Sequence, residues 1–420
     1  MSKFIEFIAR KAKNNKTIKK AYQSTVNSYL NTHIGEITPF NARISENSER
    51  RINLLVPSIN QEHLFGGIST ALHFFDRFYE LDEKAARRII TTDASPGNED
   101  LNKFGDYTVV SSEEDSRIES QIVPFNDRYN KTLPIGKEDV FIATSWWTAY
   151  FAQRIVRWQA EAYNQMPKKV IYFIQDFEPG FYSWSSQYSL ALSTYLYKGE
   201  QLAVFNSSLL KEFFNNHGFK FSEEYCFEPK LNASLKQHLA PFEQLNKKKK
   251  ILLYGRPSVA RNAFTVIIEA LRNWVWIQPD SLEWEIVSAG EQHNDIDVGN
   301  GVIIKSRGKM SLEDYANELK ESAIGISLMI SPHPSYPPLE MAHFGMLVLT
   351  NSYENKDLSN LHDNIRSIDD ISPDILAAKL QSVCSEFLTN SSIGRVKGND
   401  NYLNESDQFH FIESLVRGTR

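Results

Sequence analysis

The sequence predicts an α/β protein with two doubly wound, Rossmann-like domains that face each other across a cleft. Strand-like apolar runs alternate with helical stretches twice along the chain, first from residue 51 and again after the lysine run at residues 247–250. Strands that alternate with helices are typical of a parallel sheet covered by helices on both faces. The length of 420 residues favours the same division, because it exceeds what one ordinary hydrophobic core accommodates.

We expect four segments along the chain. Residues 1–48 form a basic helical arm and a connector, residues 49–230 and 231–400 form the two α/β domains, and residues 401–420 end the chain with a helix. Apolar runs predict strands at residues 51–58, 87–92, 107–112, 139–145, 168–175 and 201–208, and in the second domain at 249–256, 283–290, 302–307, 323–330 and 346–351. Helical patterns cover residues 71–81, 147–162, 209–217, 263–274, 312–321, 338–344 and 374–388. Ser311 and Asp314 form a capping signal for the helix at 312–321.

The composition argues against several classes of function. The net charge of −6 argues against nucleic acid as a partner, because phosphate binding requires a basic face. The 2 cysteines, Cys226 and Cys384, lie far apart, which is typical of a reducing compartment. No apolar run reaches the length of a membrane span. We therefore expect a cytoplasmic protein.

The first 20 residues are basic, with seven Lys or Arg against the single acid Glu6. Their apolar residues roughly follow helical spacing, so a basic amphipathic helix could lie on an anionic membrane surface. This would make the protein peripheral on the inner face of the membrane. The alternative is a solvated arm, which is what charge runs commonly are.

Residues 331–350 carry the most informative pattern in the chain. An apolar run at 325–330 precedes a loop with four prolines, and Pro337 and Pro338 stand where a helix could begin. Glu340 falls on the first turn of that helix, which stops at Gly345. A carboxylate beside the end of a buried strand is well placed to bind the hydroxyls of a nucleotide. The alternative is a Glu that only complements the helix dipole.

Three cations are expected at the carboxyl ends of strands in the second domain. Arg256 ends the strand at 249–256, Arg261 follows in the next loop, and Lys309 lies beside Gly308 beyond the strand at 302–307. Singly, each is more often a surface charge. Together they predict a diphosphate site.

Gly66 and Gly67 follow the first strand and precede a helix, where glycine lets backbone N–H groups approach an anion. A glycine pair is also often only a turn. The sequence contains no GxGxxG, GxxxxGK[ST] or GxSxG. These absences argue against nicotinamide binding, P-loop phosphoryl transfer and a nucleophile elbow.

A second candidate site lies in the first domain, where Gln175, Asp176 and Glu178 follow the strand at 168–175. A carboxylate there could orient an acceptor hydroxyl or serve as a general base, and Asp176 is the best candidate. Trp146 and Trp147 end the preceding strand, and aromatic faces suit the apolar faces of sugar rings. Most of the rings in this region are nevertheless expected in the core.

Asp295 and Asp297 have the DxD spacing that some sugar-nucleotide enzymes use for a metal. Their loop is rich in Asn, Asp and Gly, which turns require in any case. We therefore expect no metal and no other cofactor.

These features resemble the GT-B glycosyltransferases, and residues 339–351 are similar to the signature of the retaining family 4 type. The likeness runs from about residue 50 to the C-terminus and is closest to bacterial rhamnosyltransferases that build S-layer or cell-surface polyrhamnan from dTDP-L-rhamnose. The resemblance implies that Glu340 binds the ribose-type ring and that Arg256 and Lys309 bind the diphosphate. Gly66 and Gly67 would lie against the phosphates or donor sugar, and the last helix would cross back to the first domain.

The resemblance also implies retention of configuration and a lipid-linked or oligosaccharide acceptor, bound in the first domain. Two departures from the family pattern stand out: Pro332 replaces a frequent Glu, and Gln175 replaces a frequent His. Two alternatives stay open. One is an idle nucleotide-sugar-binding subunit of a glycan-assembly complex, and the other is a two-domain sugar-nucleotide epimerase.

Overall fold

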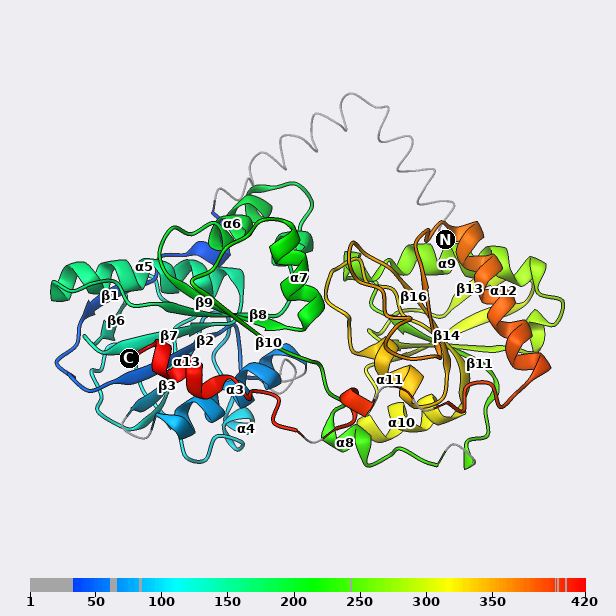
Figure 1. The fold of residues 1–420 in the computed structure, drawn as a ribbon, viewed down its shortest axis with the longest axis horizontal. Coiled ribbons are helices and arrows are strands. Elements are labelled where there is room, and N and C mark those ends of the chain that lie inside the picture. The colour runs from blue at the N-terminus through cyan, green and yellow to red at the C-terminus, as the bar shows by residue number, and fades with distance from the viewer. Residues whose placement is uncertain are drawn as a thin grey trace, which may run out of the picture.

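The computed structural model contains two parallel α/β sheets, each with helices on both faces (Figure 1). It describes residues 33–60, 66–82, 85–241, 244–396, 398, 400–404 and 406–420. The predicted fold class is confirmed. The expected membrane-binding arm at residues 1–20 lies outside the described residues.

The N-terminal domain is built on an eight-stranded sheet of order β10-β9-β8-β7-β2-β3-β5-β4, in which every neighbouring pair is parallel. Its strands are β2 (Arg51–Val56), β3 (Ala86–Thr91), β4 (Thr108–Val109), β5 (Ser120–Pro124), β7 (Asp139–Ala143), β8 (Val170–Ile174), β9 (Gln201–Asn206) and β10 (Glu223–Phe227). Its helices are α3 (Gly67–Leu81), α4 (Asn98–Leu101), α5 (Trp146–Tyr163), η2 (Glu178–Phe181), α6 (Ser186–Tyr195) and α7 (Ser208–Asn216). The strand order changes direction between β2 and β7.

The C-terminal domain is built on a seven-stranded sheet of order β13-β14-β12-β11-β15-β16-β17, parallel except for the edge pair β13–β14. Its strands are β11 (Lys248–Gly255), β12 (Glu285–Gly290), β13 (Ile296–Gly299), β14 (Val302–Gly308), β15 (Ser322–Ile326), β16 (Leu347–Asn351) and β17 (Ile365–Ile368). Its helices are α8 (Ala233–Lys236), η4 (Ala260–Asn262), α9 (Phe264–Ile277), η5 (Ser281–Glu283), α10 (Leu312–Glu321), α11 (Pro337–His343) and α12 (Pro373–Thr389). The Ser311 side chain accepts the N–H of Asp314 at the start of α10, as predicted.

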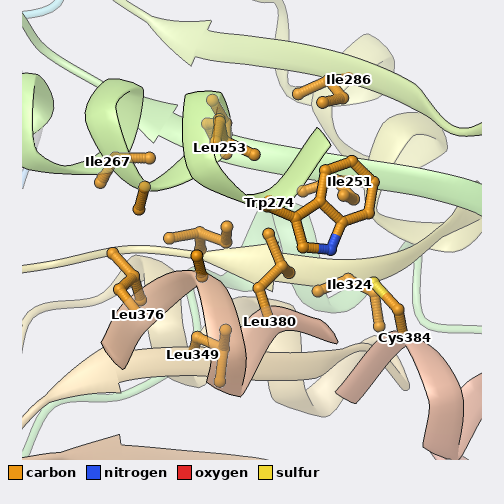
Figure 2. Close-up of a cluster of buried hydrophobic side chains, with 14 of the residues drawn as sticks. Ile251, Leu253, Ile267, Trp274, Ile286, Ile324, Leu349, Leu376, Leu380 and Cys384 are labelled. Atoms are coloured by element: carbon orange, nitrogen blue, oxygen red, sulfur yellow. The ribbon is translucent and has the colours of Figure 1, made fainter. Parts of the chain in front are cut away.

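Each sheet is sandwiched between two hydrophobic clusters. In the C-terminal domain, α9 and α12 cover one face and α10 and α11 the other. Figure 2 shows Trp274 of α9 beside Ile251 and Cys384, where side chains of both helices pack on the strands. Both Cys226 and Cys384 are free thiols.

The segment expected as a connector contains η1 (Gly35–Ile37) and β1 (Asn41–Ile44). Strand β1 pairs in parallel with β6 (Thr132–Ile135) in a separate two-stranded sheet. Phe40 packs on Phe125, with ring centroids 4.7 Å apart. Residues 35–44 therefore pack on the N-terminal domain.

The chain ends on the N-terminal domain after η6 (Asp400–Tyr402) and α13 (Ile412–Gly418), as Figure 1 shows in red. The Phe409 ring lies 5.3 Å from that of Phe74 on α3, and Arg50 Nη2 donates to Thr419 Oγ1 at 2.8 Å. Among the described residues, no helix combines the length and apolarity that crossing a bilayer requires.

Strand β15 ends at Ile326, four residues before the predicted end at 330. The N–H of Ser327 still donates to the Leu349 carbonyl of β16, but the backbone beyond it bonds to a side chain and a loop. The N–H of Met329 donates to Asn351 Oδ1 at 2.6 Å, and the N–H of Ile330 donates to the Arg261 carbonyl at 2.7 Å. This early end opens the sheet edge where the candidate site lies.

Candidate active site

The centre of the candidate site lies at the carboxyl ends of the neighbouring strands β11 and β15, where the strand order of the C-terminal sheet changes direction. The chain runs from β11 to β12 on one side and returns to β15 on the other. Open α/β sheets bind ligands outside the carboxyl ends of their strands at such a point. Asn262 Nδ2 donates to the Leu328 carbonyl at 3.1 Å, which ties the two loops that leave these strands.

Arg256 and Arg261 both follow β11. Arg256 comes directly after Gly255 and is exposed. The guanidinium of Arg261, in η4, lies 4.0 Å from the centroid of the Phe181 ring, and its Nε lies 3.7 Å from Asp176 Oδ2. Since Phe181 and Asp176 belong to the N-terminal domain, Arg261 reaches across to the opposite domain.

Lys309 occupies a different place from the two arginines. It is exposed and follows Gly308 at the end of β14, which β12 separates from β11. Gly308 has φ 60°, and a Cβ there would overlap the Gln292 side chain, so glycine is required at this position.

Glu340 lies in the first turn of α11, where Pro337 and Pro338 begin the helix as predicted. The Tyr315 hydroxyl, from α10, donates to Glu340 Oε2 at 3.1 Å. Burial raises the pKa of Glu340 to about 7, although the hydrogen bond from Tyr315 opposes the shift. The carboxylate is thus held in place and costly to ionise until donors surround it.

The loop between β15 and α11 contributes polar groups that the sequence did not single out. The Ser331 hydroxyl donates to Asp176 Oδ1, and Asn206 Nδ2 donates to the Tyr336 hydroxyl at 3.2 Å. Both bonds join the two domains. Pro332 lines a small pocket together with Asp176 and Ser331.

His333 in the same loop is buried, with 7% of its surface exposed. Its Nδ1 accepts the N–H of Ser335 at 3.0 Å, so Nε2 carries the proton in the neutral ring. Within the described residues Nε2 has no hydrogen-bond partner. Burial lowers the pKa of His333 to about 4, which keeps the ring neutral at pH 7.

Lys356, in the loop after β16, is fully buried, and its Nζ donates to the Met329 carbonyl at 2.6 Å. Burial lowers its pKa to about 7, and the charge of Asp176 opposes the shift. The only signal in the sequence is a lysine five residues after a predicted strand.

In the N-terminal domain, Gly66 has φ 58° and precedes α3, which begins at Gly67. A Cβ on Gly67 would overlap the side-chain amide of Gln175, so the glycine lets Gln175 lie against the start of the helix. The Oε1 atom of Gln175 is buried and has no hydrogen-bond partner in the described part of the chain.

Asp176 and Glu178 follow β8 but differ in environment. Asp176 faces the pocket, whereas Glu178 lies beneath it and accepts from the Tyr172 hydroxyl at 3.2 Å. Burial raises the pKa of Glu178 to about 8, with the backbone N–H of Trp146 opposing the shift. Glu178 is therefore mainly protonated at pH 7.

The two predicted acceptor tryptophans make internal hydrogen bonds. Trp146 is fully buried, and its Nε1 donates to the Tyr182 hydroxyl at 2.9 Å. Trp147 Nε1 donates to Asp93 Oδ1 at 3.1 Å. The structure thus places Trp146 in the core of the N-terminal domain.

The DxD pair has structural partners. Asp295 Oδ2 lies 2.8 Å from Lys305 Nζ, and Asp297 Oδ1 accepts the N–H of Gly299 at 2.8 Å. Across the described ranges, no three His, Cys, Asp or Glu side chains are grouped so that they could hold a metal ion.

Two parallel α/β domains that meet at this edge, with cations after β11 and a carboxylate on α11, define a GT-B glycosyltransferase. HepE of Anabaena in complex with UDP shares the fold with a TM-score of 0.53 and 11% identity, over 88% of this chain and 99% of that one. The sucrose-phosphate synthase of Thermosynechococcus elongatus does so with a TM-score of 0.54 and 11% identity, over 88% and 97%.

Family models of the N-terminal and C-terminal domains of WsaF match residues 51–208 and 249–381. The chain therefore belongs to the WsaF family, which confirms the resemblance drawn from the sequence. It is also 26% identical over 260 residues to the O-antigen biosynthesis protein RfbC of Myxococcus xanthus. This match covers 61% of the chain but 19% of that protein, so the chain spans about a fifth of the relative's length.

Proposed function

We propose that the protein transfers L-rhamnose from dTDP-L-rhamnose to a growing cell-surface glycan, with retention of configuration. The observation that carries this proposal is the meeting of Arg261, Asp176 and Ser331 between the domains, in a chain of this family. The O-antigen biosynthesis protein supports a glycan acceptor, and the UDP complex of HepE supports a nucleotide donor.

The donor would bind mainly to the C-terminal domain. Glu340 accepts the hydroxyls of the sugar ring of the nucleotide, and Arg256 and Arg261 bind the diphosphate after β11, with Lys309 contributing from the end of β14. Gly66 leaves room for a phosphate or the donor sugar at the start of α3, whereas the Gln175 side chain occupies the space beside Gly67. All of these side chains lie at strand ends or helix starts, where a dinucleotide-like ligand is held in this type of sheet.

Two groups found in the structure extend this donor site. His333 Nε2 carries an N–H that has no acceptor within the described residues, and Lys356 Nζ lies against the Met329 carbonyl in the loop after β15. The His333 N–H could donate to a sugar hydroxyl or a phosphate oxygen, and the Lys356 ammonium could pair with a phosphate charge. An anion beside Lys356 would favour its protonated form.

The chemistry needs little covalent work from the protein. The bond from the sugar C1 to the diphosphate oxygen breaks while positive charge develops on the sugar ring. Arg256 and Arg261 stabilise the negative charge that grows on the leaving diphosphate, and groups so placed are typically worth ~10²–10³ in rate. The leaving phosphate oxygen takes the acceptor proton as the new bond to C1 forms on the same face. Asp176 orients the acceptor hydroxyl.

A thermal-shift panel of dTDP, UDP and GDP tests the donor. A ligand at 100 times its dissociation constant stabilises a protein by about 2.7 kcal/mol, so dTDP should give the largest rise in melting temperature. Incubation with dTDP-L-rhamnose and a rhamnose oligosaccharide should then yield dTDP and a longer product whose new linkage keeps the anomeric configuration of the donor, as read by NMR. Tight binding without transfer would favour an idle subunit, and a new sugar nucleotide formed without acceptor would favour an epimerase.

The acceptor class and cellular location follow from the same proposal. We expect a lipid-linked or oligosaccharide acceptor and a cytoplasmic protein, with membrane contact through residues 1–20. Deleting residues 1–30 should weaken co-sedimentation with anionic vesicles, and unchanged co-sedimentation would contradict that contact.

A further inference from the structure

One aromatic pair near the cleft is unusual in its exposure. Trp184 is 92% exposed, the most exposed of the large hydrophobic side chains among the described residues. Its ring stacks on that of Tyr188, with centroids 5.6 Å apart and planes 9° from parallel. A large ring left in water forgoes the burial that normally stabilises a fold, so an exposed stacked pair suggests a binding surface.

Hydrogen bonds hold the backbone that carries the pair. The Ser185 side chain accepts the N–H of Tyr188 at 3.2 Å and caps α6, so the segment that carries both rings has a fixed start. Tyr182, two residues before Trp184, is tied to Trp146 in the domain core. Groups fixed in this way lose little conformational freedom on binding.

The pair is also continuous with the candidate active site. Phe181, three residues before Trp184, lines the pocket with Asp176, Arg261 and Tyr353. Three residues span at most about 11 Å, so Trp184 lies near the rim of that pocket. Tyr353, from the opposite domain, lines the same pocket.

We propose that Trp184 and Tyr188 form a platform on which a sugar ring of the acceptor saccharide stacks, with the acceptor chain leading from there to Asp176. This platform rests on the proposed transferase function and names the acceptor-binding surface of the same site. Trp146, which the sequence suggested for this role, is fully buried. The exposed Ser183, Ser186 and Ser189 beside the pair offer hydroxyls to the edge of a sugar.

A membrane surface is the other occupant that an exposed Trp–Tyr pair could suit. Binding to an anionic bilayer draws on Lys and Arg near the apolar side chains. Residues 178–195 contain neither Lys nor Arg, but five serines and one glutamine. This composition favours a saccharide.

The test compares Trp184→Ala with Trp276→Ala in the full-length protein. Trp276 is also exposed, at 71%, but lies at the end of α9 in the other domain. With dTDP-L-rhamnose and rhamnotriose, Trp184→Ala should raise the KM for rhamnotriose at least tenfold, while the Kd for dTDP and the hydrolysis of the donor without acceptor stay unchanged. Trp184→Phe should recover most of the loss, and Trp276→Ala should behave like the unaltered protein.

Binding of rhamnotriose, followed by saturation-transfer NMR with and without dTDP, separates this proposal from the proposed function. Binding that Trp184→Ala abolishes would support the platform even if no transfer occurred. Absence of binding to the unaltered protein, or equal binding by Trp184→Ala, would overturn it. The proposal would also be overturned if Trp184→Ala lost co-sedimentation with phosphatidylglycerol vesicles while its KM for rhamnotriose stayed unchanged.

Discussion

Two clusters of buried charge lie at opposite edges of the sheets, and they differ in how fully their carboxylates are hydrogen-bonded. The first is the structural cluster, Arg51, Arg88 and Asp139, at the amino-end side of the N-terminal sheet. Asp139 Oδ1 accepts from Arg51 Nε at 3.0 Å. Its Oδ2 accepts from Arg51 Nη2 at 2.8 Å, Arg88 Nη2 at 3.3 Å and the Gly136 N–H at 2.9 Å. This carboxylate has a full set of donors.

The second is the cleft cluster, Asp176, Arg261 and Lys356, at the carboxyl ends of the strands. Arg261 and Asp176 are 3.7 Å apart, and Arg261 Nε lacks a hydrogen-bond partner in the described part of the chain. Lys356 Nζ is buried, and desolvation disfavours its protonated, charged form. Each cluster contains one arginine nitrogen without a hydrogen-bond partner among the described residues, Arg51 Nη1 and Arg261 Nε. Only Asp176 and Arg261 of the cleft cluster line the pocket of the candidate site, so a ligand there could complete bonds that would otherwise be costly to leave unmade. We infer that the structural cluster stabilises the fold and that the cleft cluster binds an anion.

The largest expected effect is on stability, at the structural cluster. Asp139→Asn removes the charge that two buried arginines share, and breaking a buried pair in this way typically costs about 3–5 kcal/mol. Urea denaturation followed by circular dichroism should show this loss. Asp176→Asn is the matched variant, and it should cost less stability than Asp139→Asn, because its ion pair with Arg261 is 3.7 Å long, while transfer falls. Equal losses in the two variants would remove the distinction between the clusters.

The next effect is on catalysis, at the cleft cluster. Arg261→Ala should lower kcat/KM for the donor by roughly 10²–10³, because it removes a cation from the leaving diphosphate. Arg256→Ala should act similarly. Lys309→Ala should cost less, since β12 separates its strand from β11. Arg272→Ala is the control, because Arg272 is exposed and its ion pair is with Glu269 on the same helix. Near-normal turnover of Arg261→Ala would contradict the diphosphate site.

Glu340→Gln should separate binding from stability. Loss of the carboxylate as acceptor should weaken dTDP binding by roughly 10- to 100-fold in calorimetry, the usual effect of losing hydrogen bonds to a charged group.

Without ligand the same variant should be more stable than the unaltered protein at pH 8. The folded state raises the pKa of Glu340 from 4.5 to about 7, so the unaltered protein loses stability as the pH rises through 7, and Gln does not. We expect a gain of about 1–3 kcal/mol at pH 8 and none below pH 4.5. If Glu340→Gln bound dTDP as tightly as the unaltered protein, Glu340 would not bind the nucleotide and would only complement the helix dipole.

The sequence was sufficient to predict the doubly wound fold because strand and helix periodicity are local properties. It also predicted α11 and the place of Glu340, since Pro337, Pro338 and Gly345 mark the limits of that helix. It missed β5, which ends in Pro124, and β17. Short buried strands are identified by their neighbours in the sheet more than by their own residues.

The candidate site was harder to predict because it depends on contacts between segments far apart in sequence. Asp176 and Ser331 are 155 residues apart, and no periodicity indicates that they meet. The burial of Lys356 and His333 likewise arises from packing of loops against both domains. Trp184 and Trp146 are only 38 positions apart in one aromatic-rich region, yet one is exposed and the other is core. Composition alone does not distinguish them.

The smallest effect compares two buried lysines, one in the cleft and one outside it. Burial lowers the pKa of both Lys356 and Lys247 from 10.5 to about 7. Lys247 Nζ donates to the carbonyls of Leu319 and Phe344, at 2.6 and 2.7 Å. In each case the stability that is present above pH 10.5 is lost as the pH falls through 7, because the folded state disfavours the proton.

Lys356→Met should therefore stabilise the free protein by about 1–2 kcal/mol at pH 7, with the gain shrinking toward pH 10. Saturating dTDP should reverse the order, since the diphosphate gives Lys356 a partner that Met lacks. Lys247→Met should show a smaller gain, because it leaves two buried carbonyls without a donor, and dTDP should shift its melting temperature as much as that of the unaltered protein. If dTDP raised the melting temperature of the unaltered protein, Lys356→Met and Lys247→Met equally, Lys356 would have only a structural role. Arg261 would then be the one cation of the cleft cluster that binds the diphosphate.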